Sequence, residues 1–455
     1  MRCPHLCCAS ASPVGVFLLG AIALVMTAEA LAAPTIGQSG NTDSRVAITE
    51  DDLVQRASLE ALIRFAVENN PSILAAKSDW EAARQRIATQ SWYENPMVTF
   101  TPDTGDMAET RAGPQGNSLE ISQAIPFPGK LGLRGQVAES RAAASHELVK
   151  ATSQEVGRQV RARYADYYLA AKALDINVET SDLTRQFADV AQAKYQVGKA
   201  AQQDVILAHE HISRLAAERV RLQADWESAI GALNTLLNRR PRAPLGPPSD
   251  LDAVPLPISL ERLVDAADDD RPELNSQAHV VDASRHAVSL ARMGYLPDFK
   301  LALQWTEIQG GTNPSFARDG NDVWMVRFGF SVPIWLNRIG AEVKEMEAQV
   351  RRDESRRRDL TNQVRDQVQQ HYERVVAAVR TEQIYRATLI PQTTERVAAA
   401  RAGYQTGMVD FLTVIDSLRS LEEMRLQRDR AVRDYQQAFA DLERAVGRPI
   451  ADLVP

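Results

Sequence analysis

The chain has 455 residues and a formal net charge of −7, a mildly acidic balance that gives no reason to expect a nucleic-acid partner. Its three cysteines, Cys3, Cys7 and Cys8, all lie within the first eight residues. A chain cleaved after residue 32 would therefore have neither a disulfide nor a thiolate metal site.

Residues 1–32 have the pattern of a secretory signal peptide. An apolar stretch from Val14 to Met26 is followed by small residues and a plausible cleavage position after Ala32. The stretch is too short for a membrane-spanning helix, which needs about 20 residues. No other segment has 18 or more uninterrupted apolar residues. We therefore predict that the chain is exported from the cytoplasm.

Two sequence motifs recur with similar offsets. Asn70-Pro71 corresponds to Arg271-Pro272 with an offset of 201, and Tyr195-Gln196-Val197-Gly198 corresponds to Tyr404-Gln405-Thr406-Gly407 with an offset of 209. This period is far longer than the roughly 20–50 residues of a solenoid unit. We interpret the pattern as a duplicated half-molecule. The expected parts are a first repeat over 33–240, a linker over 241–270 and a second repeat over 271–455.

The first repeat starts with a helical pattern from Asp51 to Gln90. Alternating apolar and polar residues on both sides of a glycine- and proline-rich loop then predict a β-hairpin over about 96–126. No proline occurs from Leu131 to Val197. A continuous helix of this length would reach about 100 Å. A tight turn over about 195–204 and a return helix complete this repeat.

The second repeat shows the same order after a proline-rich linker. It predicts a helix from Pro272, a β-hairpin over about 297–333 and a long helix from Ile339 to about Ala402. A kink is expected at Pro391, because proline cannot donate to the helical ladder. A turn over about 404–411 leads to a return helix with a heptad pattern typical of a coiled coil.

This order of elements constrains the assembly. Two strand pairs cannot close a barrel alone, and an open sheet edge in lipid would leave backbone groups without hydrogen bonds. Three chains would supply twelve strands, an even number within the range of bacterial barrels. We therefore predict a mainly α-helical chain that forms a homotrimer. Its 12-stranded membrane β-barrel, four strands from each chain, would continue into a long α-helical barrel.

The chain resembles the outer membrane efflux protein (TolC) family, the outer membrane factors of tripartite export systems. The resemblance rests on the duplicated order of elements, Asn70-Pro71, the two Tyr-Gln-x-Gly turns and the closing Gly447-Arg448-Pro449. The segment Ile125–Lys130 is similar to members that serve heavy-metal exporters. The resemblance implies a passive efflux conduit in the outer membrane of a Gram-negative bacterium, in contact with outer membrane lipid. It also implies a periplasmic adaptor protein and an inner-membrane transporter, of the RND type, as partners.

In that family the two turns form the periplasmic tip, where the adaptor docks. Carried over to this chain, the resemblance implies eight docking residues: Tyr195, Val197, Gly198, Lys199, Tyr404, Thr406, Gly407 and Met408. Asp204 and Asp416 match positions where family members place carboxylates near the constricted end, and Asp410 is a third candidate for the gate. In a trimer each would form a ring of three, which favours cations.

Simpler interpretations of these residues stay open. The two glycines could serve only to turn the chain. Asp204 and Asp410 could serve only at helix N-termini, whereas Asp416 lies farther along its helix. Where some family members carry an arginine that latches the closed tip, this chain has Val409. A latch must therefore be built from other residues.

Other chemistry is weakly indicated. His209 and His211 would point in different directions from one helix, so a solvated helix surface is a better interpretation than a metal site. No nucleophile, base and oxyanion donors occur together, so we predict neither an enzyme nor a cofactor. The cargo would be metal cations or small toxic compounds. The alternatives are a type I secretion conduit, a periplasmic adaptor and a soluble structural coiled-coil protein.

Overall fold

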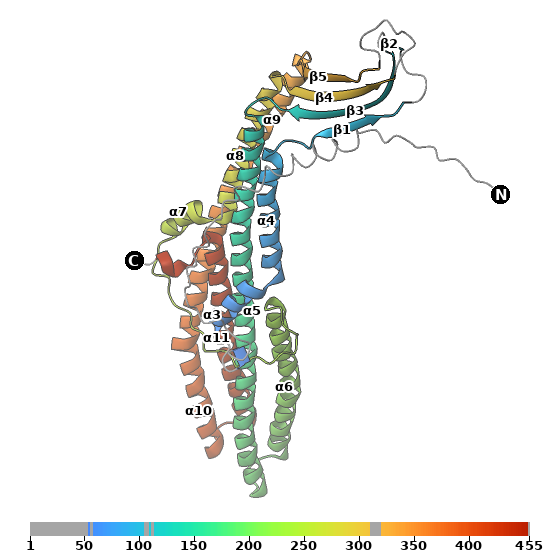
Figure 1. Cartoon of the computed structure of the whole chain (residues 1–455). Helices are drawn as coiled ribbons and strands as arrows, with labels where there is room; N and C mark the ends of the chain where they lie inside the picture. Colours follow the sequence, from blue (N-terminus) through green and yellow to red (C-terminus); the bar gives the residue numbers. More distant parts are fainter. Residues whose placement is uncertain (1–52, 55–57, 104–108, 111–112, 310–319, 454–455) are drawn as a thin grey trace, which may run out of the picture. The chain divides into compact units, whose positions relative to one another are not determined.

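A computed structural model describes residues 53–54, 58–103, 109–110, 113–309 and 320–453 (Figure 1). The predicted signal peptide over 1–32, with its cysteines, lies outside the described residues. The described part is mainly helical and carries one sheet with four long strands, which confirms the predicted class of fold for one chain. None of the described helices is both long enough and apolar enough to cross a membrane.

Two consecutive helices precede the strands in each half of the chain. α3 (Leu59–Asn69) leads directly to α4 (Pro71–Ser91), and α7 (Leu260–Asp270) leads to α8 (Pro272–Arg292). In each pair the first helix has 11 residues and the second has 21. Asn70 caps α4, because its side-chain oxygen accepts a hydrogen bond from the Ser72 amide at 2.9 Å. α7 lies within 241–270, so the segment expected as a linker contains a helix equal in length to α3.

The longest helix of the first half is α5 (Lys130–Gln196), which has 67 residues. Its length follows from the absence of proline, since nothing interrupts the backbone ladder. α6 (Gln202–Leu236) returns along it, and the two helices pack against each other over much of the length of α6. α5 also contacts α4, α8 and α11, so it connects the two halves of the chain (Figure 1).

The outgoing helix of the second half is interrupted once. α9 (Leu336–Ile384) is joined to α10 (Ile390–Thr406) by a π-helical turn over Tyr385–Leu389. The turn lies just before Pro391, whose missing amide hydrogen disturbs the regular ladder. The irregularity expected at this proline is therefore a π-helical turn. α11 (Phe411–Val446) returns to complete the half.

The two hairpins form one continuous antiparallel sheet. Its long strands are β1 (Met97–Thr101), β3 (Gly113–Ile125), β4 (Phe299–Ile308) and β5 (Val323–Phe330), in the order β1-β3-β4-β5. A two-residue strand, β2 (Glu109–Thr110), pairs with the beginning of β3. The β3–β4 ladder joins the hairpin of one half to that of the other. β1 and β5 each leave one edge unpaired within the described chain.

The two faces of this sheet differ in polarity, because side chains alternate along each strand. The apolar face contains in-register rows of large hydrophobic residues: Val98, Ile121, Leu303 and Val326 form one row, and Phe100, Leu119, Trp305 and Trp324 form the next. Val326 is 73% exposed and Val98 is 62% exposed. On the polar face, Thr99, Glu120, Gln304 and Met325 form the row between these two, and Met97, Ser122, Ala302 and Arg327 form the next row towards the helices.

Three buried clusters hold the helices together. One packs α3 against α5 and α6, with Leu62, Tyr164 and Leu233 fully buried. A second packs α7 against α9 and α11 around Leu263 and Val368. The third, which we call the tip core, joins the ends of α5, α6, α10 and α11: Phe187, Ala188, Ala191, Ala208, Ala400, Tyr404, Phe411, Val414, Ile415 and Leu418. The tip core brings the two predicted turns into one structural unit.

Candidate functional site

The two predicted tip turns have the same backbone geometry. Gly198 follows α5 with φ of +71°, and Gly407 follows α10 with φ of +81°. In each turn the next amide returns to a carbonyl five residues back, from Lys199 to Lys194 at 2.8 Å and from Met408 to Gly403 at 2.8 Å. These bonds are those of a Schellman motif, which ends a helix with a left-handed residue.

Glycine is required at both turns by backbone conformation and not by a close contact. A Cβ atom added to Gly198 or Gly407 would meet no atom of the described chain within 4 Å. A left-handed conformation nevertheless costs any other L-residue about 1–2 kcal/mol. The turn interpretation therefore accounts for both glycines, while the space beside them is open to another molecule.

The residues predicted to dock an adaptor are exposed, with one exception. Met408 is 84% exposed, Val197 is 67% exposed and Tyr195 is 42% exposed. Lys199 and Thr406 are also exposed. Tyr404 is only 4% exposed and belongs to the tip core. The two tyrosines of the repeated motif therefore have different surroundings, and only Tyr195 presents its side chain at the surface.

Tyr404 connects the two helical hairpins. Its hydroxyl donates a hydrogen bond to Oδ2 of Asp204 on α6 at 3.1 Å. The Lys194 ammonium on α5 donates to the Tyr404 carbonyl and lies 4.5 Å from the centre of its ring. Burial raises the pKa of the Tyr404 hydroxyl, and the neighbouring Asp204 carboxylate acts in the same direction. The hydroxyl therefore stays protonated and keeps its donor role at neutral pH.

The other two predicted gate carboxylates have local partners. Asp410 is the N-cap of α11, because its side chain accepts a hydrogen bond from the Thr413 amide at 3.0 Å. Hydrogen bonds from Thr413 lower the pKa of Asp410. Asp416 is exposed and forms an ion pair with Arg419 at 3.6 Å. Asp204 lies in the first turn of α6 but is not its cap, which is Ala201.

His211 is buried, which corrects the interpretation of both histidines as solvated. His209 is exposed, but His211 is 3% exposed and neither of its ring nitrogens has a hydrogen-bond partner in the described structure. It lies on the same face of α6 as buried Ala208 and Leu215, spaced three and four residues away. This helical spacing was the available signal. Burial lowers the pKa of His211 to about 4, and the charges of Arg419 and Arg214 act in the same direction.

Acidification is expected to destabilise the helices around His211. Its folded-state pKa of about 4 lies below the ordinary value of 6.5, so the unfolded chain binds the proton first. The stabilising contribution is complete above pH 6.5 and falls by about 1.4 kcal/mol per pH unit towards pH 4. His211→Gln should therefore lose less thermal stability than the wild type between pH 7 and pH 5. Thermal unfolding followed by circular dichroism measures this difference.

The exposed neighbour provides the control for that measurement. His209→Gln changes the same residue type two positions away on the same helix, and His209 is exposed. Its acid sensitivity should equal that of the wild type. If His211→Gln and His209→Gln lose stability equally on acidification, the titration of His211 has no part in the acid response.

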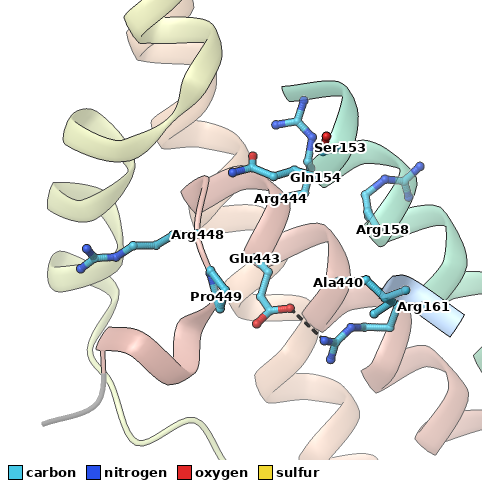
Figure 2. Close-up of a pocket in the computed structure, with 11 residues that line it drawn as sticks. Ser153, Gln154, Arg158, Arg161, Ala440, Glu443, Arg444, Arg448 and Pro449 are labelled. Atoms are coloured by element: carbon cyan, nitrogen blue, oxygen red, sulfur yellow. Dashed lines mark ion pairs between the residues drawn. The ribbon is translucent and has the colours of Figure 1, made fainter. Parts of the chain in front are cut away.

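A second candidate site is a cavity of about 310 Å³ between α3, α5 and the end of α11 (Figure 2). Four arginines and one glutamate contribute to its lining. Each guanidinium already has a carboxylate partner: Arg158 with Asp441, Arg161 with Glu443, Arg444 with Glu273 and Arg448 with Asp270. The positive charge is therefore balanced, and we assign no anion to the cavity. Among the described residues no group of three or more potential ligands is placed to hold a metal ion.

Known proteins resemble this chain in sequence and fold. The family model of the outer membrane efflux protein matches residues 62–239 and 263–448. The alkaline protease secretion protein AprF of Pseudomonas aeruginosa is 24% identical over 403 residues, covering 83% of this chain and 82% of AprF. The cobalt-zinc-cadmium resistance protein CzcC of Cupriavidus metallidurans is 21% identical over 422 residues, which cover 91% of this chain and 95% of CzcC. The crystal structure of CusC has a TM-score of 0.72 at 19% identity, and the similarity covers 87% of this chain and 94% of the CusC chain.

Proposed function

Because the chain belongs to the outer membrane efflux protein family, we propose that it is the outer membrane channel of a tripartite export system. It would be a passive trimeric conduit from the periplasm to the exterior, and not an enzyme. One combination of features carries this proposal. An amphipathic sheet lies at one end of the fold, and at the other end a hydrogen bond from Tyr404 to Asp204 joins the two helical hairpins beside their turns (Figure 1). Family membership argues against the adaptor and structural coiled-coil alternatives.

The sheet supports the membrane end of the proposal. Its apolar face exposes large side chains from all four long strands, including Phe100, Ile121, Leu303 and Val326. Exposed apolar surface of this extent has a free-energy cost in water and is stable against lipid. The free edges of β1 and β5 would pair with those of neighbouring copies, so that three chains close a barrel of twelve strands. The apolar face would then contact outer membrane lipid.

Contacts beside the two tip turns support the proposed gate at the periplasmic end. The bond from Tyr404 to Asp204 and the contact of Lys194 with Tyr404 tie α10 to α5 and α6. Val409, the position without the latching arginine, is an apolar residue packed against the tip core. We propose that the Tyr404–Asp204 bond replaces that arginine as the latch of the closed tip. Binding of adaptor and transporter would shift the equilibrium towards an open tip.

The partners follow from the same proposal. A periplasmic adaptor would dock on the exposed tip residues Tyr195, Val197, Lys199, Thr406 and Met408, beside the two glycines. Tyr404 would contribute to docking indirectly, since it holds the turn in place from inside the tip core. An inner-membrane transporter, of the RND type, would supply the energy. The cargo would be metal cations or small toxic compounds; the similarity to AprF keeps a type I secretion conduit as the second candidate.

Removal of one hydroxyl is expected to open the tip. Tyr404→Phe keeps the ring in the tip core but removes the donor to Asp204. A hydrogen bond to a charged group contributes about 1.5 kcal/mol or more, so the open fraction should rise by about tenfold. Single-channel conductance of the purified protein in planar lipid bilayers measures this change.

Tyr195→Phe is the matched control for the latch, because Tyr195 occupies the corresponding place in the repeated motif and is exposed. Its conductance should equal that of the wild type. Equal conductance of the Tyr404→Phe and Tyr195→Phe variants would contradict the latch. A wild-type protein that is not a trimer in detergent, or that forms no channel, would contradict the conduit itself.

A further inference from the structure

The polar face of the sheet carries three charged residues among the described strand positions: Glu120 on β3, Lys300 on β4 and Arg327 on β5. Glu120 pairs across the ladder with Gln304, which in turn lies next to Met325. Arg327 lies one row from that position towards the helical end of the strands, and Lys300 lies two rows from it. The three charges therefore gather in adjacent rows of one face.

These side chains contact one another. Nη1 of Arg327 lies 2.9 Å from Oε2 of Glu120, and Nζ of Lys300 lies 4.0 Å from Oε1 of the same carboxylate. Arg327 also donates a hydrogen bond to the side-chain oxygen of Gln304. One carboxylate thus serves two cations, and each chain has one positive charge in excess at this level of the sheet.

The two cations of this cluster are also more exposed than its carboxylate. The Glu120 side chain is 21% exposed, whereas those of Arg327 and Lys300 are 50% and 57% exposed. The carboxylate is thus partly covered, and the two cations face the open space beside the polar face. A cross-strand pair that served only to stabilise the sheet would need a single cation opposite the carboxylate.

We propose that Arg327 and Lys300 form a cationic belt inside the barrel, which favours small anions over small cations and so opposes the cation preference expected of the carboxylates at the tip. The proposal rests on the trimeric conduit, in which the polar face lines the lumen. Three chains would then contribute six cations and three carboxylates within these adjacent rows. Charges in the lumen of a barrel tune its selectivity, and rings of arginine or lysine favour anions. The effect should be largest at low ionic strength, because the Debye length is about 30 Å at 0.01 M salt and about 8 Å at 0.15 M.

The belt is tested by ion selectivity. Full-length trimers are inserted into planar bilayers in a gradient of potassium chloride, and the reversal potential gives the ratio of chloride to potassium permeability. Arg327→Gln combined with Lys300→Gln should lower this ratio by roughly twofold. Glutamine keeps a polar side chain at both positions, and the backbone ladder between β4 and β5 does not depend on these side chains. Each variant is measured in the wild-type and in the Tyr404→Phe background, so that the tip contributes equally to every comparison.

Glu120→Gln provides a control of opposite sign. It removes the only carboxylate of the cluster and leaves both cations, so the chloride-to-potassium ratio should rise. Equal ratios in all variants, or a shift of both variants in the same direction, would overturn the belt. A wild-type protein that forms no channel would instead contradict the conduit, so the two failures are distinguishable.

Discussion

Gly447→Ala is expected to destabilise the folded chain by about 4 kcal/mol. Gly447 ends α11 with φ of +93°, in the left-handed region that favours glycine. A Cβ atom there would lie 2.7 Å from the Cα atom of Arg271 and 3.0 Å from the Asp270 carbonyl oxygen. Both are backbone atoms at the junction of α7 and α8, so no side-chain rotation can relieve the contact. Thermal unfolding of the detergent-solubilised protein measures the loss.

Gly407→Ala separates the two causes of that loss. Gly407 has a similar φ of +81°, but a Cβ atom there would meet nothing within 4 Å. Only the conformational cost of about 1–2 kcal/mol should remain. Gly447→Ala should therefore have the lower melting temperature of the two. Equal melting temperatures would mean that the approach of α11 to Arg271 does not limit stability.

These two glycines also show which features could be predicted from the sequence and which could not. The turn at Gly407 was predictable, because a Tyr-Gln-x-Gly motif ends a long helical pattern and needs only local conformation. The long helices and the alternating strands were predictable for the same reason, since their patterns are local. The contact of Gly447 with the α7–α8 junction joins residues more than 170 positions apart, and no local pattern indicates it.

The candidate site shows the same limit. Tyr195 and Tyr404 have the same place in the same motif, yet one is exposed and the other is buried against Phe411, with 5.2 Å between the ring centres. Only the packing of the α10–α11 pair on the α5–α6 pair distinguishes the two tyrosines. The hydrogen bond to Asp204 joins two residues 200 positions apart in sequence. The resemblance to the family implied Asp204 and Tyr404 as separate candidates, and the structure brings them together.

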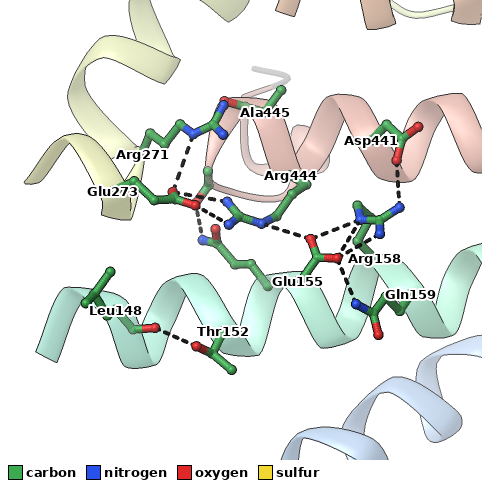
Figure 3. Close-up of polar contacts among 12 residues, drawn as sticks. Leu148, Thr152, Glu155, Arg158, Gln159, Arg271, Glu273, Asp441, Arg444 and Ala445 are labelled. Atoms are coloured by element: carbon green, nitrogen blue, oxygen red, sulfur yellow. Dashed lines mark hydrogen bonds and ion pairs between the residues drawn. The ribbon is translucent and has the colours of Figure 1, made fainter. Parts of the chain in front are cut away.

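The second large effect is expected at Glu273, which lies on α8 and binds two arginines from different elements (Figure 3). Its carboxylate accepts hydrogen bonds from both Nη atoms of Arg444 on α11, one of them at 3.1 Å. It also lies 3.4 Å from Nε of Arg271. Nε of Arg444 lies 3.5 Å from Glu155 on α5, so the network joins α5, α8 and α11.

Glu273→Gln should destabilise the chain by about 3 kcal/mol, because it leaves two largely buried guanidinium groups without their shared carboxylate. The side chains of Arg271 and Arg444 are 10% and 14% exposed. Burial alone would raise the pKa of Glu273, but hydrogen bonds from Arg444 and the charges of both arginines more than offset it, so the net pKa is lowered. Its stabilising contribution is thus present above the ordinary pKa near 4.5 and is lost as pH falls below it.

Glu218→Gln is the control for an exposed pair, since Glu218 binds Arg221 on the surface of α6 with 40% and 62% of the two side chains exposed. It should cost less than about 1 kcal/mol. A double variant with Glu273→Gln and Arg444→Met tests the mechanism. Removing Arg444 as well leaves one fewer buried guanidinium without its Glu273 carboxylate, so the double variant should be more stable than the sum of the two single losses predicts. Additive losses would show that Glu273 acts through packing and not through its charge.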